Sequence, residues 1–149
     1  MGLKKWMLKF GPGSPVKAAK FFANQYKELA TKNADWEIVF TAMYCSRVLA
    51  VQRLDPRNSA GGLLQEEDPR AIIEFSQGDI CLFIFMLMWL ETAQFRKDIS
   101  IGILEINSII EVIRETVEPI EPSMIKLDQK ECGNNALQFA ITSGIQNGL

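Results

Sequence analysis

The longest apolar run in the chain covers residues 80–90 and is bounded by Asp79 and Glu91. No Gly or Pro interrupts it, and its Leu and Met residues are good helix formers, so the pattern predicts a helix. Eleven helical residues span roughly 16 Å, about half the thickness of a bilayer core. Charged and polar residues on both sides prevent a longer apolar window. The run therefore predicts a buried central helix, residues 80–96, and no transmembrane segment; a buried strand is the lesser alternative.

The segments before this run have the three- to four-residue spacing of amphipathic helices. Helix start signals, a capping side chain or a Pro at the first position, introduce residues 15–32, 36–54 and 70–77. In residues 36–54 the apolar positions lie on both sides, so we expect this helix to be covered on both. Gly78 then interrupts the chain, and Asp79 is placed to cap the central helix.

After the central run, isoleucine recurs every three or four residues through residues 99–117. This a/d-type seam predicts a helix packed within a bundle. At the start of this segment isoleucines alternate with small residues, so a strand is the alternative for residues 99–106. Periodicity then weakens, and we predict an irregular, weakly structured tail over residues 119–149, with at most a short helix capped by Asn135.

Together these segments predict an all-α fold, a compact bundle of about five helices around the central helix 80–96. A chain of 149 residues is long enough to bury a sizeable core and to form a single domain over residues 1–149. Residues 55–67 contain a Pro and two Gly among short polar residues, and we predict a mobile loop there.

Residues 1–10 place apolar side chains at helical spacing beside three lysines, which predicts a short basic amphipathic helix. The candidates for contact with a partner or a membrane surface are Leu3, Lys4, Lys5, Trp6, Met7, Lys9 and Phe10. Packing against the core or a neighbouring protein suits so short a segment best. Binding at the surface of an anionic membrane is the alternative.

Charge is divided unevenly along the chain. Residues 1–54 hold nine Lys or Arg and three acids, a net +6, whereas residues 55–149 hold seven and fifteen, a net −8. This asymmetry indicates complementary faces within the fold or between copies. The acidic majority and the absence of a recognition motif argue against nucleic-acid binding.

Three cysteines, odd in number and far apart in the sequence, indicate free thiols in a reducing compartment. The first ten residues carry three lysines before any apolar region of adequate length, so they do not form a signal-peptide pattern. We therefore expect a cytoplasmic protein.

The chain contains no histidine, which removes the commonest general base, the triads that depend on it and the His-containing zinc sites. Nucleotide-binding and thiol-redox motifs are also missing. Glu74, Asp79 and Glu91 flank the apolar run, where burial can prepare a carboxyl for acid–base catalysis. A capping role for Asp79 and solvated edges for the two glutamates explain them better. We favour a protein without enzyme activity, and an enzyme that uses carboxylates or a Cys is the lesser alternative. We assign no catalytic residue, no metal site and no cofactor.

The excess of apolar helix surface favours a non-enzymatic protein–protein interaction module, which self-associates into a homo-oligomer or binds another protein. One alternative is a binder of an apolar small molecule or acyl chain, because Met and aromatic walls adapt to ligands. The residues expected to line its pocket are Phe83, Phe85, Met86, Met88 and Trp89. A second alternative is a peripheral membrane protein that uses residues 1–10.

Overall fold

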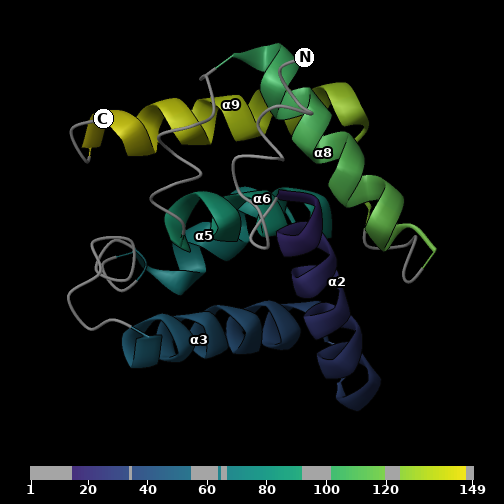
Figure 1. Cartoon of the computed structure of the whole chain (residues 1–149), viewed down its shortest axis with the longest axis vertical. Helices are drawn as coiled ribbons and strands as arrows, with labels where there is room; N and C mark the ends of the chain where they lie inside the picture. The colour runs from purple at the N-terminus through teal and green to yellow at the C-terminus, as the bar shows by residue number, and fades with distance from the viewer. Residues whose placement is uncertain are drawn as a thin grey trace.

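Six α-helices make up most of what the computed structural model describes, namely residues 15–33, 35–54, 64, 67–91, 102–119 and 125–146 (Figure 1). The helices are α2 (Pro15–Lys32), α3 (Trp36–Leu54), α5 (Pro69–Ser76), α6 (Ile80–Glu91), α8 (Ile103–Val117) and α9 (Gln129–Gln146). No strand occurs in these ranges, so the all-α prediction is confirmed. Residues 103–106 are helical, which decides against a strand at those positions.

Several predicted features fall outside the described residues. They are the amphipathic segment 1–10, residues 92–96 of the central helix, residues 99–101 of the isoleucine seam and all of the loop 55–67 except residues 64 and 67. Leu64 is fully buried, and the hydroxyl of Tyr44 donates to the backbone carbonyl oxygens of Leu64 and Glu67.

Helix α6 is the centre of the bundle. Every residue from Ile80 to Leu90 is at most 2 % exposed, and the helix contacts α2, α3, α5, α8 and α9. In Figure 1 it lies between α3 along one edge of the molecule and α9 along the opposite edge. A helix that is apolar all round must be covered all round. The fold supplies that cover within one chain, so α6 leaves no apolar face for another subunit.

A tight turn separates α5 from α6 at the predicted position. Asp68 caps α5 by accepting a hydrogen bond from the backbone N–H of Arg70 at 2.9 Å. Gln77 and Gly78 then take left-handed backbone angles, with φ of 57° and 77°. Such a conformation ends a helix and suits glycine, which lacks a Cβ. The chain can therefore turn sharply and start α6 at Ile80.

Two amphipathic helices cover one side of α6. Helix α2 buries Ala19, Phe22, Ala23 and Tyr26 and exposes Lys17, Lys20 and Lys27. Helix α8 buries Ile106, Ile109, Ile110, Ile113 and Val117, as its isoleucine spacing predicts. These helices contact each other as well as α6, which closes that side of the core.

The predicted irregular tail is wrong for residues 129–146, which form the 18-residue helix α9. Its cap is Asp128, whose carboxylate accepts from the backbone N–H of Glu131 at 2.7 Å, and not Asn135. Polar and glycine residues lower its intrinsic helix propensity. Packing against α6 and α8 compensates, because Cys132, Ala136, Phe139 and Ala140 are buried on one face.

Candidate functional site

The five residues predicted to line a pocket belong mostly to the packed core. The rings of Phe83 and Phe40 stack 4.1 Å apart at 11°, and those of Phe85 and Trp89 stack 6.3 Å apart at 18°. Met88 is only 2 % exposed. Met86 alone of the five lines one of the described cavities. The seven N-terminal candidates, residues 3–7, 9 and 10, lie outside the described residues.

Asp79 is a buried structural carboxylate. Its Oδ1 accepts hydrogen bonds from the backbone N–H groups of Cys81 and Leu82, at 2.8 and 3.1 Å, which confirms the predicted cap of α6. Its Oδ2 accepts from the backbone N–H groups of Lys126 and Leu127, at 2.9 and 2.8 Å. The side chain is fully buried. These four donors hold the carboxylate in place and give it a structural role.

Glu91 differs from the predicted solvated edge, because its carboxylate forms an ion pair with Arg47, and both side chains are 13 % exposed. Arg47 Nε donates to Glu91 Oε2 at 3.0 Å, and Arg47 Nη2 donates to Glu91 Oε1. The guanidinium also lies 4.9 Å from the ring centre of Phe21 and 5.2 Å from that of Phe22. Arg47 therefore ties α2, α3 and the end of α6 together. Glu74 is exposed.

The three cysteines are free thiols in contrasting surroundings. Cys45 is exposed on α3, whereas Cys81 and Cys132 are fully buried. Burial, reinforced by the nearby Asp79 carboxylate, raises the pKa of Cys81 and of Cys132 well above the ordinary value of 9.0. Because the thiolate is the reactive form, we expect Cys45 to react and the buried pair to be inert.

The outer face of α3 is the most extensive exposed apolar stripe on a single described helix. It consists of Ile38, Ala42, Cys45 and Leu49, and we call these four residues the α3 outer face. Ile38 is 52 % exposed and Leu49 is 51 % exposed. Cys45 is exposed and Ala42 is half-buried. The expectation that α3 is covered on both sides is therefore wrong.

The position of α3 explains why this face is open. Its opposite side packs on α2, α5 and α6 through Val39, Phe40, Met43 and Val51. Figure 1 places the helix at the edge of the molecule, where no described helix lies beyond it. The sequence shows apolar residues on both sides of α3, and they form one stripe that is buried in the core and a second stripe that is exposed. The exposed stripe is recognisable in the sequence by the helical spacing of residues 38, 42, 45 and 49.

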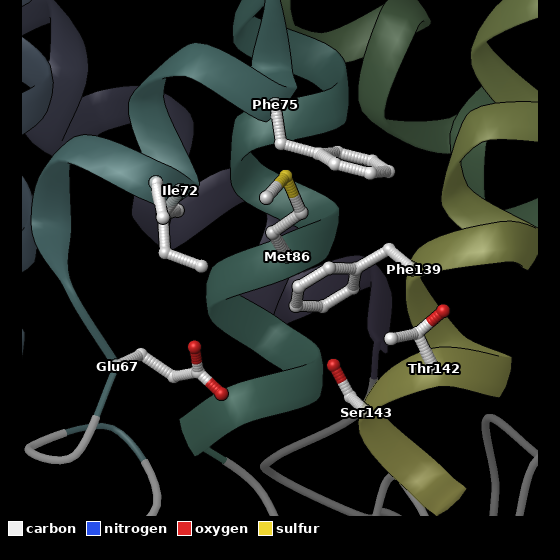
Figure 2. Close-up of a pocket in the computed structure, with 8 residues that line it drawn as sticks. Glu67, Ile72, Phe75, Met86, Phe139, Thr142 and Ser143 are labelled. Atoms are coloured by element: carbon white, nitrogen blue, oxygen red, sulfur yellow. The ribbon is translucent and has the colours of Figure 1, made fainter. Parts of the chain in front are cut away.

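A cavity of about 150 Å³ lies between α5, α6 and α9, and we call it the α5–α9 cavity (Figure 2). Its lining residues are Glu67, Ala71, Ile72, Phe75, Met86, Phe139, Thr142 and Ser143. In Figure 2 the apolar side chains surround most of it, and the Glu67 carboxylate and Ser143 hydroxyl lie toward one end.

Comparisons with protein-family models, curated proteins and solved structures found no match. Function must therefore be inferred from the geometry of this chain.

The described residues include no group of three or more cysteine or acidic side chains arranged to hold a metal ion. None of the described helices combines the length and the apolarity needed to cross a membrane.

Proposed function

We propose that the protein is a non-enzymatic helical interaction module that self-associates by pairing the α3 outer faces of two copies. The observation that supports this is the exposed apolar stripe on α3, where two large aliphatic side chains are about half exposed. Scattered apolar residues are normal on a protein surface, but an aligned set on one helix indicates a contact surface.

The spacing of the stripe suits another helix. Steps of four, three and four residues between Ile38, Ala42, Cys45 and Leu49 are those of a and d positions, which pack into the matching positions of a facing helix. Ile38 and Leu49 are roughly 16 Å apart along the axis. The small central pair, Ala42 and Cys45, permits close approach at the usual interaxial distance of about 8–10 Å.

Charge favours an antiparallel pair of identical helices. Asp35 and Glu37 are exposed at the start of α3, and Arg53 is exposed near its end. A parallel pair would bring acid to acid and Arg53 to Arg53. An antiparallel pair instead places each Arg53 near the acids of the other copy and opposes the two helix dipoles.

The two-fold axis of this pair would pass between Ala42 and Cys45. Ile38 would then pack on Leu49 of the second copy, and Ala42 on Cys45. The residue numbers of both pairs add to 87, so a single register satisfies both contacts. One helix pair of this length forms a small interface, and we expect a dissociation constant of roughly 10–100 µM.

We also propose that the protein is located in a reducing compartment such as the cytoplasm. The support is that all three cysteines are free, two of them buried.

Disulfide trapping tests the pairing and its direction. The Ala42→Cys/Cys45→Ser variant is mixed with ¹⁵N-labelled wild-type protein and oxidised mildly, and the products are identified by intact mass. Antiparallel pairing predicts that the mixed dimer forms faster than either homodimer, because position 42 faces position 45 of the other copy. Parallel pairing predicts homodimers, which would contradict the proposed direction.

Absence of any trapped dimer at 200 µM, about twice the highest expected dissociation constant, would overturn self-association. A specific alternative occupant is residues 1–12 of the same chain. If Cys45 reacts slowly in a monomer and deletion of those residues speeds its alkylation, that segment covers the face and the proposal is wrong.

A further inference from the structure

The basic residues of the first third of the chain are concentrated before and along α2. Residues 1–32 hold seven Lys and one acid, a net +6, whereas residues 33–54 hold two Arg and two acids, a net charge of zero. Helix α2 itself contains four of these Lys and the acid, Glu28. All five of these charged side chains are exposed. The positive charge of residues 1–54 therefore comes from this one part of the chain.

One side of α2 presents positive charge to solvent. Lys20, Phe21, Asn24 and Lys27 are exposed, and at about 100° per residue they occupy roughly a third of the helix circumference. We call these four residues the α2 basic face. Lys20 and Lys27 are two turns apart, roughly 10 Å along the axis. Within the part of the chain that the structure describes, neither ammonium is paired with an acid.

An aromatic ring lies among these charges. Phe21 is 52 % exposed. Its ring centre lies 5.5 Å from that of Phe22 and 4.9 Å from the Arg47 guanidinium, and these contacts hold the ring in place without burying it. Lysines around a partly exposed ring on one side of a helix are typical of a segment that lies at the surface of an anionic membrane.

We propose that the α2 basic face binds the surface of an anionic phospholipid membrane, with the axis of α2 parallel to that surface. The ammonium groups of Lys20 and Lys27 lie among the anionic lipid head groups, and the ring of Phe21 enters the head-group region. Each lysine at such a surface strengthens binding roughly fivefold. The acidic remainder of the chain opposes binding only weakly, because exposed charges more than about 8 Å away are largely screened at physiological ionic strength.

Lysine suits a fluid lipid surface better than a fixed site. Its ammonium is a point charge on a flexible stem, whereas the planar guanidinium of Arg favours fixed, bidentate partners such as nucleic-acid phosphates. The basic residues of α2 are all Lys. One half-exposed ring also offers too little apolar area for a stable contact with a protein. The α2 basic face shares no residue with the α3 outer face, so membrane binding does not depend on self-association.

Co-sedimentation of the full chain with vesicles tests the proposal. Vesicles of phosphatidylcholine alone are compared with vesicles that also contain about 30 % phosphatidylserine. The protein is kept at roughly 1 µM, where the proposed dimer is dissociated. We expect half of the protein to bind the anionic vesicles at about 1 mM accessible lipid in about 0.1 M NaCl. Binding should be at least tenfold weaker to phosphatidylcholine alone or in about 0.5 M NaCl.

Two double variants that remove the same charge locate the site. Lys20→Gln/Lys27→Gln should weaken binding to the anionic vesicles at least tenfold, because two lysines contribute roughly fivefold each. The matched control is Arg70→Gln/Lys130→Gln, at exposed positions of α5 and α9, and it should bind within about twofold of wild-type protein.

Two single variants test the other parts of the surface. Glu28→Gln removes the exposed acid of α2 and should strengthen binding severalfold. Phe21→Ala removes the exposed ring and should weaken binding severalfold, with circular dichroism showing an unchanged helix content. Wild-type affinity in both variants would contradict the placement of α2 on the membrane.

Four further results would overturn the proposal. The first is equal loss of binding in the two double variants, and the second is no binding to anionic vesicles at 10 mM lipid, about ten times the expected value. The third is binding that survives Lys20→Gln/Lys27→Gln and is lost in Lys4→Gln/Lys5→Gln/Lys9→Gln. The fourth is tighter binding to polyglutamate or duplex DNA than to the vesicles, compared at equal anion concentration, which would assign the face to another class of partner.

Discussion

The carboxylate of Asp79 accepts a hydrogen bond from the backbone N–H of Leu127, 48 residues further along the chain, at 2.8 Å. The same carboxylate caps α6 through Cys81 and Leu82. One side chain thus starts the central helix and holds the segment that leads into α9. Because this group is fully buried, a donor that lost it would have no water to replace it.

We predict that Asp79→Asn destabilises the protein by about 2–4 kcal/mol. The amide nitrogen of Asn cannot accept, so at least one pair of buried N–H groups loses its acceptor. Guanidinium unfolding followed by circular dichroism measures the change. The matched control is Glu74→Gln, an exposed acid-to-amide change expected to stay within about 0.5 kcal/mol. Similar stability of both variants would contradict the role given to Asp79.

Local signals in the sequence predicted that Asp79 caps α6, but they did not predict its hydrogen bond with the backbone N–H of Leu127. A carboxylate directly before an apolar run is recognisable as a cap, and the prediction of α6 needed only the run itself. The contact with Leu127 joins segments far apart in the chain, and no local pattern encodes it. For the same reason α9 was missed, since α6 and α8 supply the burial that its own composition does not indicate.

The candidate site shows a similar division. The sequence indicated a Met and aromatic cluster, but only packing decides which members face a cavity, and Met86 does. Likewise, the apolar residues on both sides of α3 were visible in the sequence. Their exposure depends on α3 lying at the edge of the bundle, which follows from the tertiary arrangement alone.

Gly133 provides a test of close helix packing. A Cβ at this position of α9 would overlap the side-chain oxygen of Asn107 on α8. Gly→Ala ordinarily stabilises a helix by about 1 kcal/mol. Here we predict that Gly133→Ala destabilises the protein by about 1–3 kcal/mol, because the two helices must separate or Asn107 must move.

A double-mutant cycle with Asn107→Ala tests whether the destabilisation by Gly133→Ala comes from overlap with Asn107. Asn107 Oδ1 is buried and accepts no hydrogen bond from any described residue, so Asn107→Ala alone should cost less than about 1 kcal/mol. It should also relieve the overlap, giving a coupling energy of at least about 1 kcal/mol in the Gly133→Ala background. Stabilisation by Gly133→Ala in the wild-type background would show that α8 and α9 are less tightly packed than described.

The buried thiols predict a loss of stability at high pH. The folded chain holds the thiol protons of Cys81 and Cys132 with pKa values raised above 9.0. Above about pH 9 the unfolded chain releases these protons while the folded chain keeps them, so the free energy of unfolding falls as pH rises. The expected slope is about 1.4 kcal/mol per pH unit for each thiol.

Unfolding at pH 8, 9 and 10 measures this slope. Cys81→Ala and Cys132→Ala should each reduce it, because each removes one buried thiol. Burial also raises the pKa of Tyr44 to about 12, which adds a similar loss above pH 10. An unchanged slope in the two Ala variants would mean that the buried thiols do not titrate as described.

Sedimentation equilibrium of Leu49→Glu, compared with Leu104→Glu, tests the central claim most directly. Both leucines are exposed, by 51 % on α3 and 76 % on α8, so the two variants make the same chemical change on different surfaces. Wild-type protein and Leu104→Glu should pass from monomer to dimer over roughly 1–500 µM, and Leu49→Glu should stay monomeric. A monomeric wild type over that range, or equal dimerisation of the two variants, would contradict self-association through the α3 outer face.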